Sequence, residues 1–213
     1  MRNYDLPDRR GLLLAGASLL TLSACGNLIG PGDVSSQIFV LSPQLPSVEG
    51  VTSLKVQLAI ATPETSGSLM TDRIALVRNG VFDYYAAAQW TDATPQLLQN
   101  LLLEAFDKAG AMGSVAKDLE GIHADYVVQS AVSAFEARYD HGDAAPTVAV
   151  AITVKVISAA HADIVDAKEF RQESAATANN ISAVVAAFDV ALAAILPEIA
   201  RWVLELARRP IRR

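Results

Sequence analysis

Catalytic and metal-binding chemistry requires thiols, imidazoles or carboxylates that converge on one point. The chain has one cysteine, and its histidines stand beside or within predicted turns, far from one another in sequence. HExxH, GxSxG and clustered Cys/His spacings, which would bring such groups together, do not occur. The carboxylates Asp163 and Asp166 stand at loop edges, where a solvated charge is the commoner role than a general acid and base. The sequence therefore predicts no enzyme, no metal site and no cofactor; the histidines are His123, His141 and His161.

The cysteine, Cys25, follows a segment with the three parts of an export signal. Arginines stand among the first ten residues, and the apolar run 11–22 covers only 12 residues, whereas a helix needs roughly 20 to cross a membrane. Leu22-Ser23-Ala24-Cys25 resembles the bacterial lipobox, in which the thiol receives a diacylglycerol and the signal is cut before it. We predict that residues 1–24 are a lipoprotein signal peptide and that Cys25 carries lipid. The alternative is a free thiol behind an ordinary signal.

The signal also bears on route and destination. Arg9-Arg10 fits a twin-arginine signal, but adjacent arginines are also common in ordinary signals, so both export routes stay open. Gly26 follows the cysteine where, in familiar lipoproteins, an aspartate would favour retention in the inner membrane. Each buried methylene contributes about 0.8 kcal/mol, so two or three acyl chains hold a protein firmly. We predict the periplasmic face of the outer membrane.

Charge and composition narrow the partners. Removing residues 1–24 takes three Arg and two Asp from 17 basic and 23 acidic side chains, which leaves a net charge of about −7. Such a chain repels phosphate backbones, so nucleic acid is not an expected partner. Residues 25–36 are rich in turn formers and predict a lipidated, flexible tether. Residues 37–213, with an apolar fraction of 52% in the chain, predict one domain.

Periodicity predicts the order strands, helix, strands, helix. Ile38–Leu41 and the alternating stretch 53–60 form early strands, and Asn79-Gly80 forms a tight turn that sets Val77 opposite Phe82 and Ala75 opposite Tyr84. Thr94 is an N-cap candidate, with Pro95 at the first helical position. A stripe of leucines then predicts an amphipathic helix that Gly110 can end. The stripe is Leu97, Leu98, Leu101, Leu102, Ala105, Phe106 and Ala109.

Three strands and a helix complete the chain. Strands over 126–135, 147–157 and 164–172 predict an antiparallel meander, and valines and isoleucine from 148 to 156 share one face. Apolar residues from Ile181 to Leu206 recur near every 3.6 residues behind a cap at Asn179 or Asn180. Pro197 interrupts this pattern and predicts a kink or two helices. The fold class is α+β, with a mixed, mostly antiparallel sheet and helices packed on one face.

Two groups of side chains admit two interpretations. Tyr84, Tyr85 and Trp90 either contact a partner or lipid, or are buried between the hairpin and the following helix, which we favour. The arginines that close the chain either touch anionic head groups or meet a helix dipole and solvent, which is the commoner explanation. The latter are Arg208, Arg209, Arg212 and Arg213.

The central stretch 72–106 carries a recognisable signature: Asp72-Arg73-Ile74-Ala75-Leu76-Val77, Tyr84-Tyr85, Trp90, Thr94-Pro95 and Leu97-Leu98. It resembles the ABC-type transport auxiliary lipoprotein family, the PqiC-like lipoproteins that accompany MCE-domain lipid transport systems. Ile38–Leu41 resembles that family's opening strand, whereas Gly110-Ala111-Met112 departs from its Gly-Gly-Phe-like ending. The resemblance spans roughly Gln37 to Leu206.

The resemblance implies a non-catalytic accessory subunit of an intermembrane lipid transport system. Its implied partners are an MCE-domain protein and an ABC permease and ATPase, and because some members assemble as rings, a homo-oligomeric ring is implied as well. The contrary hypothesis is a structural outer-membrane lipoprotein for envelope integrity or secretion, with no transport partner. Only Cys25 has a named chemical role.

Overall fold

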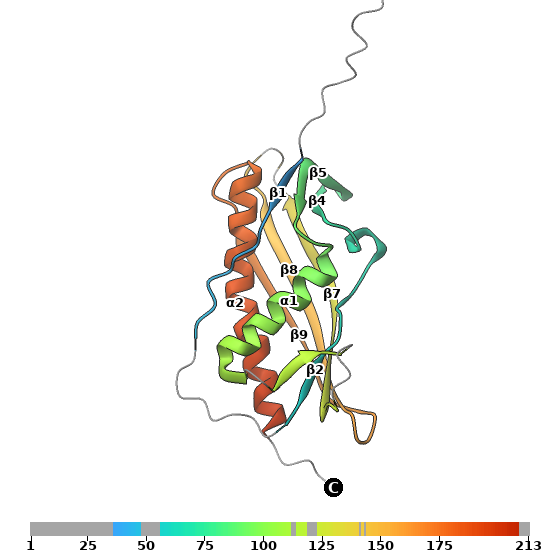
Figure 1. Ribbon diagram of the computed structural model, residues 1–213. Helices are drawn as coiled ribbons and strands as arrows, with labels where there is room; N and C mark the ends of the chain where they lie inside the picture. The colour runs from blue at the N-terminus through green and yellow to red at the C-terminus, as the bar shows by residue number, and fades with distance from the viewer. Residues whose placement is uncertain are drawn as a thin grey trace, which may run out of the picture. The chain divides into compact units, whose positions relative to one another are not determined.

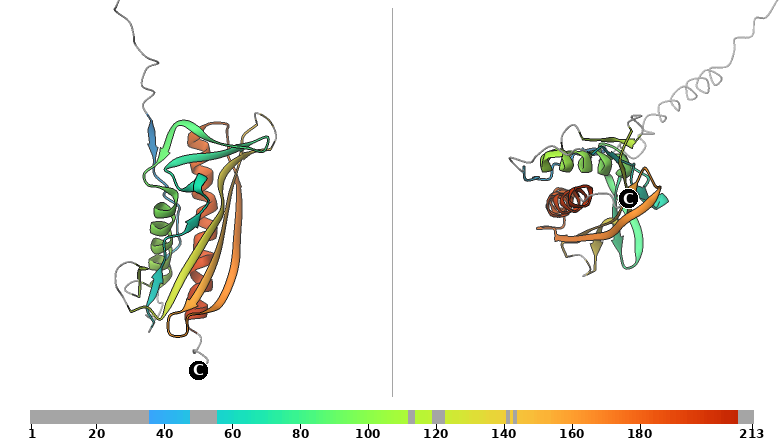
Figure 2. Two further views of the ribbon diagram at one scale, coloured as in Figure 1. Left: turned by 90° about the vertical axis from the view of Figure 1, so that its right-hand side faces the viewer. Right: turned by 90° about the horizontal axis from the view of Figure 1, so that it is seen from below.

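The structure is a computed structural model that describes residues 36–47, 56–111, 114–118, 123–140, 142 and 144–208. Ser36–Arg213 cluster as one compact unit. Two long helices lie along one side of a curled mixed sheet, with α1 beside α2 (Figure 1, Figure 2). The elements are β1 (Gln37–Phe39), β2 (Leu58–Ile60), β3 (Glu64–Thr65), β4 (Arg73–Arg78), β5 (Val81–Trp90), α1 (Thr94–Phe106), η2 (Asp107–Ala111), β6 (Val115–Lys117), β7 (Tyr126–Tyr139), β8 (Thr147–Ser158), β9 (Asp163–Ala175) and α2 (Ile181–Ala207), with a short 3-10 turn, η1 (Gly67–Leu69). The predicted α+β class is confirmed.

The hairpin β4–β5 forms as the sequence predicts. Asn79 and Gly80 have φ angles of 52° and 76°, the left-handed values that a tight two-residue turn demands. Val77 pairs with Phe82 and Ala75 with Tyr84. The turn therefore fixes the register of the signature residues that follow it.

β7 organises the sheet. It pairs antiparallel with β8, and β8 pairs antiparallel with β9, which confirms the predicted meander. Its other edge receives three short strands in succession, all parallel: β2 at Tyr126–Val128, β3 at Ala131–Val132 and β4 at Ala137–Tyr139. These parallel pairings were not predicted, because strands of two to six residues carry little periodicity of their own.

The inner face of β8 is the centre of the core. Five alternating residues of this strand are fully buried, as their shared face predicts. β9, at one edge, is exposed on most of its length. The helices therefore cover one face of the sheet, where the five residues lie: Val148, Val150, Ile152, Val154 and Val156.

α1 buries the predicted leucine stripe, but its N-cap differs from the prediction. The cap residue is Ala93, and no side chain caps the helix. Thr94 instead donates its hydroxyl to the carbonyl oxygen of Thr71 at 3.2 Å, and its backbone N–H donates to the same oxygen at 3.0 Å. The hydroxyl therefore fixes the helix start to the chain before β4. Gly110, at φ 85°, lies in η2 just beyond the helix.

α2 is one helix of 27 residues with Pro197 inside it. Of the two alternatives predicted at Pro197, a kink or two helices, the second is wrong. Proline costs about 3 kcal/mol in a helix interior. Ile195, Leu196 and Ile199 around it are buried, and each buried side chain of this size contributes about 1.5–3 kcal/mol. Burial of the flanking residues offsets the lost hydrogen bond. The predicted cap is confirmed at Asn180, whose side chain accepts from Ala183 N at 2.9 Å.

The composition of α2 also meets the length and hydropathy of a membrane-spanning helix. Its apolar face, however, packs on β8, β9 and α1, and 14 of its residues are buried. A core helix of a compact domain has the same composition. Burial in this core accounts for its hydropathy.

Candidate functional site

Trp90, at the end of β5, is 1% exposed. Its ring lies edge-on to Phe188 of α2 at 5.2 Å between centroids, and 6.1 Å from Phe135 of β7. Phe135 and Phe188 are themselves 4.7 Å apart. The indole thus joins β5, β7 and α2 in one aromatic cluster. This burial fits the structural interpretation and leaves no surface of Trp90 for a partner.

Tyr85 begins a chain of hydroxyl groups. Its OH lies 2.9 Å from that of Tyr139 in β7, and Tyr139 donates to the side-chain oxygen of Asn179 at 2.9 Å. Because Tyr139 has one proton to donate, Tyr85 donates to Tyr139. Burial and the bond with Tyr139 raise the pKa of Tyr85 well above its usual value. This row of hydrogen bonds connects β5 and β7 to the segment that caps α2.

Tyr84 is half-buried and makes its own set of contacts. It donates its hydroxyl to the carbonyl oxygen of Ser68 at 2.7 Å. The guanidinium of Arg73 stands 3.9 Å from its ring centroid, and the Phe82 ring packs against it at 5.5 Å. Tyr84 is therefore held by contacts within the fold. That either tyrosine contacts a partner stays a prediction.

A bulge between the tyrosines and Trp90 was not predicted. The partner of β5 on β4 moves from Ala75, opposite Tyr84, to Arg73, opposite Gln89, and Ala87 adopts φ 53°. Beyond the bulge, Gln89 still pairs with Arg73 of β4, while the other edge of β5 pairs parallel with β1. The sequence offered no signal for it, because only glycine, asparagine and aspartate commonly adopt the left-handed φ that Ala87 has here.

The described histidines stand near the turn between β8 and β9. His161 has its Nδ1 3.2 Å from the Ser158 hydroxyl, and His123 lines a pocket with Ala159 and Ala160, the two residues between Ser158 and His161. Asp163 and Asp166 are exposed on β9. Within the described ranges, no three His, Cys, Asp or Glu side chains could hold a metal ion. Cys25 and His141 lie outside those ranges.

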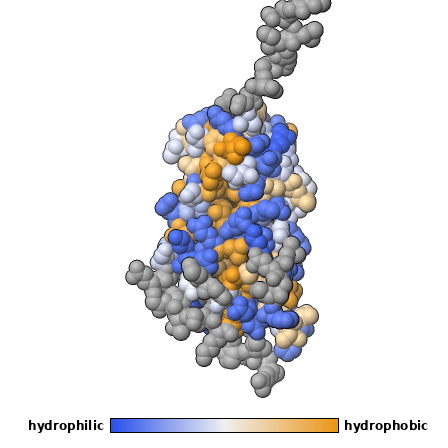
Figure 3. Space-filling view, viewed as in Figure 1, coloured by the Kyte–Doolittle hydropathy of each residue, from blue (hydrophilic) through white to orange (hydrophobic). Residues whose placement is uncertain are grey.

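An exposed apolar surface lies near the N-terminal end of the unit. It consists of Ile38 and Val40, in and just after β1, which are 61% and 65% exposed; Val190 of α2 is 61% exposed as well. Ser42 N donates to Asp189 Oδ1 at 2.7 Å, which holds the segment after β1 against α2. Figure 3 shows apolar side chains gathered where β1 lies. This N-terminal apolar surface can contact an apolar partner, and sequence periodicity did not single it out.

The protein is a small α+β domain. The signature residues Tyr85 and Trp90 pack inside it. Residues 39–200 match the family described as ABC-type transport auxiliary lipoprotein component. This chain belongs to that family, and its class is that of an accessory lipoprotein of ABC-type transport.

Solved structures share the fold at low sequence identity. The chain is similar to the protein XCC0632 from Xanthomonas campestris, with a TM-score of 0.72, 22% identity, and coverage of 81% of this chain and 97% of that one. An uncharacterized protein has a TM-score of 0.62 and 15% identity, with coverage of 79% of this chain and 99% of that one. A single-substitution variant of the PelC dodecamer from Paraburkholderia phytofirmans has a TM-score of 0.42 and 15% identity, with coverage of 75% of this chain and 93% of that one. No curated protein matches this chain in sequence.

Proposed function

We propose that this lipoprotein is the membrane-anchored, non-catalytic accessory subunit of an MCE and ABC-type system that moves lipid between the two envelope membranes. The observation that carries the proposal is the family match, which runs from β1 into α2. Lipid on Cys25 anchors the chain at the periplasmic face of the outer membrane, and residues 25–36 set the reach of the domain 37–213. The domain docks the periplasmic end of the MCE assembly.

One structural feature supports an accessory role. The signature residues Tyr85 and Trp90 are used inside the fold, in the hydroxyl contact with Tyr139 and in the buried core. What the domain offers to other molecules is its surface. The contrary hypothesis, a structural lipoprotein without a transport partner, requires the same anchor and the same fold. The two hypotheses differ only in which proteins bind the domain.

Copurification tests this proposal. The full-length protein with a C-terminal tag is crosslinked in its native membranes, extracted in mild detergent, and its companions are identified by mass spectrometry. MCE-domain, permease and ATPase subunits are the expected companions. Crosslinked multiples of the chain itself would also reveal the homo-oligomeric ring that the resemblance implies. Recovery of unrelated envelope proteins alone would overturn the transport role in favour of the structural lipoprotein.

A Cys25→Ala variant is the matched control for the anchor. The residue is the first of the predicted tether, 25–36, and precedes the predicted domain 37–213 in sequence, so folding of the domain is expected to be unchanged. We expect the variant to stay uncleaved or to leave the membrane fraction, because the thiol that takes the acyl groups is gone. Normal processing and firm membrane attachment of this variant would contradict lipidation at Cys25.

A further inference from the structure

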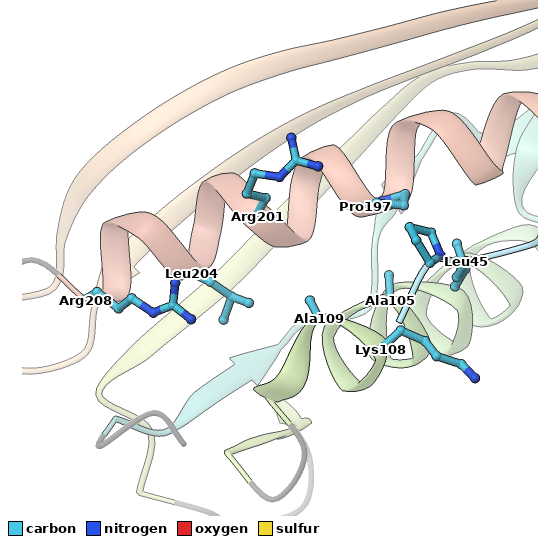
Figure 4. A pocket seen from close by; sticks show the side chains of 9 residues that line it. Leu45, Ala105, Lys108, Ala109, Pro197, Arg201, Leu204 and Arg208 are labelled. Carbon is cyan, nitrogen blue, oxygen red and sulfur yellow. The ribbon is translucent and has the colours of Figure 1, made fainter. Parts of the chain in front are cut away.

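A pocket opens between the end of α1, the second half of α2 and the segment that follows β1 (Figure 4). It has a volume of about 170 Å³. Comparable cavities of about 150 Å³ in protein cores accept a benzene molecule. The pocket therefore accommodates a short stretch of one hydrocarbon chain and is too small for a whole phospholipid.

The floor of this pocket is apolar. Figure 4 shows Leu45, Ala105 and Ala109 facing the gap across from Pro197 and Leu204 of α2. Ala105 and Leu204 belong to the buried core, so the floor is held in place by the packing of both helices. Such a rigid apolar floor favours methylene groups over water.

The rim of the pocket is cationic. Lys108 extends from η2, and Arg201 and Arg208 extend from α2; all three are exposed. Among the described residues, none of these three cations forms an ion pair, although the acids Glu104, Asp107 and Glu205 are close in sequence.

Helix dipoles explain only part of this rim. A cation at a helix C-terminus meets a favourable dipole, which accounts for Lys108 after α1 and Arg208 after α2. Arg201 stands more than one turn before the end of α2, where the effect has faded. In a chain with a net charge of −6, three cations without acidic partners around one apolar floor are complementary to an anion that carries an alkyl group.

We propose that this basic-rimmed pocket binds one amphiphile, with its anionic head at Arg201, Arg208 and Lys108 and its first methylenes on the floor between α1 and α2. This proposal rests on the proposed function, because it names the site at which a protein of lipid transport would contact lipid. Binding itself requires no transporter, so the two are tested separately.

Photolabelling of the full-length, lipidated protein in phosphatidylcholine vesicles tests the site. One probe is a hexadecanoate with a diazirine near the carboxylate, at a pH that ionises it; the other is the corresponding neutral hexadecanol. Adducts are mapped by peptide mass spectrometry. We expect the anionic probe to label peptides that contain Ala105–Ala109 or Pro197–Leu204, and the neutral probe to label them several-fold less.

Two variants separate charge from shape. Removing two exposed charge contacts with Arg201→Gln and Arg208→Gln together is expected to lower anionic labelling about threefold to tenfold. Lys155→Gln with Arg171→Gln, on the exposed parts of β8 and β9, changes the net charge equally and should leave labelling unchanged. Ala109→Leu fills the pocket and should reduce labelling by both probes; the melting temperature of each variant establishes that it is folded.

The outcomes are distinct. Equal labelling by both probes, or labelling that ignores the arginine and Ala109 variants, would overturn the site. Pocket labelling without copurification of MCE and ABC subunits would leave the site standing and remove the transport role. Copurification without pocket labelling would do the reverse.

Discussion

The end of β5 and the exposed side of α2 differ in whether their side chains find partners within the protein. Around Tyr85 and Trp90 the side chains are satisfied by the chain itself, through the aromatic cluster and the hydroxyl chain to Asn179. At Val190 and around Arg201, exposed apolar and cationic groups lack such partners among the described residues. In this fold the recognisable motif marks the scaffold, and the surfaces available to other molecules lie elsewhere.

The largest expected effect lies inside the aromatic cluster. Trp90→Ala removes a fully buried ring between Phe135 and Phe188 and should lower the free energy of unfolding by about 3–5 kcal/mol. Urea unfolding of the tagged protein followed by circular dichroism measures this. A loss below 1 kcal/mol would mean that Trp90 is not part of the scaffold, and the comparison would break.

A buried and an exposed valine on one helix give a matched test. Val184 is fully buried in the first turn of α2, whereas Val190 is exposed. Val184→Ser removes buried methyl groups and places a hydroxyl in the core, so we expect a loss of about 2–4 kcal/mol. Unfolding curves of the variant beside the wild type provide the value. Equal stability of the two proteins would place Val184 outside the core.

The hydroxyl chain should contribute less than the rings. Tyr139→Phe leaves Tyr85 without its acceptor and the Asn179 oxygen without this donor. We expect a loss of about 1–3 kcal/mol, the cost of unsatisfied buried polar groups. Tyr85→Phe, which removes only a donor, is the control and should cost less. The reverse order of the two would contradict the direction of the chain.

The sequence predicted the elements with strong local signals. Asn79-Gly80 specified the hairpin register, and the alternation in β8 and the stripe in α1 specified buried faces. It did not predict the bulge at Ala87, because an alanine at positive φ carries none of the glycine or asparagine signals that usually mark such a position. Nor did it predict the basic-rimmed pocket, since Lys108 and Arg201 are far apart in sequence and meet only through helix packing.

Asp189 tests how the segment after β1 is held on α2. Burial raises the pKa of its carboxyl, and the bond from Ser42 N opposes that rise. A raised pKa means that the native state binds the proton more readily than the unfolded chain does, so stability from this group increases as pH falls through the raised value. Asp189→Asn keeps an oxygen acceptor and removes the charge. The variant should gain stability relative to the wild type at pH 7, and the gain should shrink toward pH 4; a gain that grows toward pH 4 would contradict the sign.

Val190→Ser should have the smallest effect. The side chain is 61% exposed, and surface substitutions away from special contacts usually change stability by less than about 0.5 kcal/mol. Serine has a lower helix propensity than alanine but is close to valine, so propensity adds little. Val184→Ser and Val190→Ser make the same chemical change on the same helix, six positions apart, and any difference between their unfolding curves therefore measures burial alone. A large loss at Val190 would show that its apolar surface is already covered, by another part of the chain or by a second copy. Repeating the measurement at several protein concentrations separates these two, because only a second copy makes the loss depend on concentration.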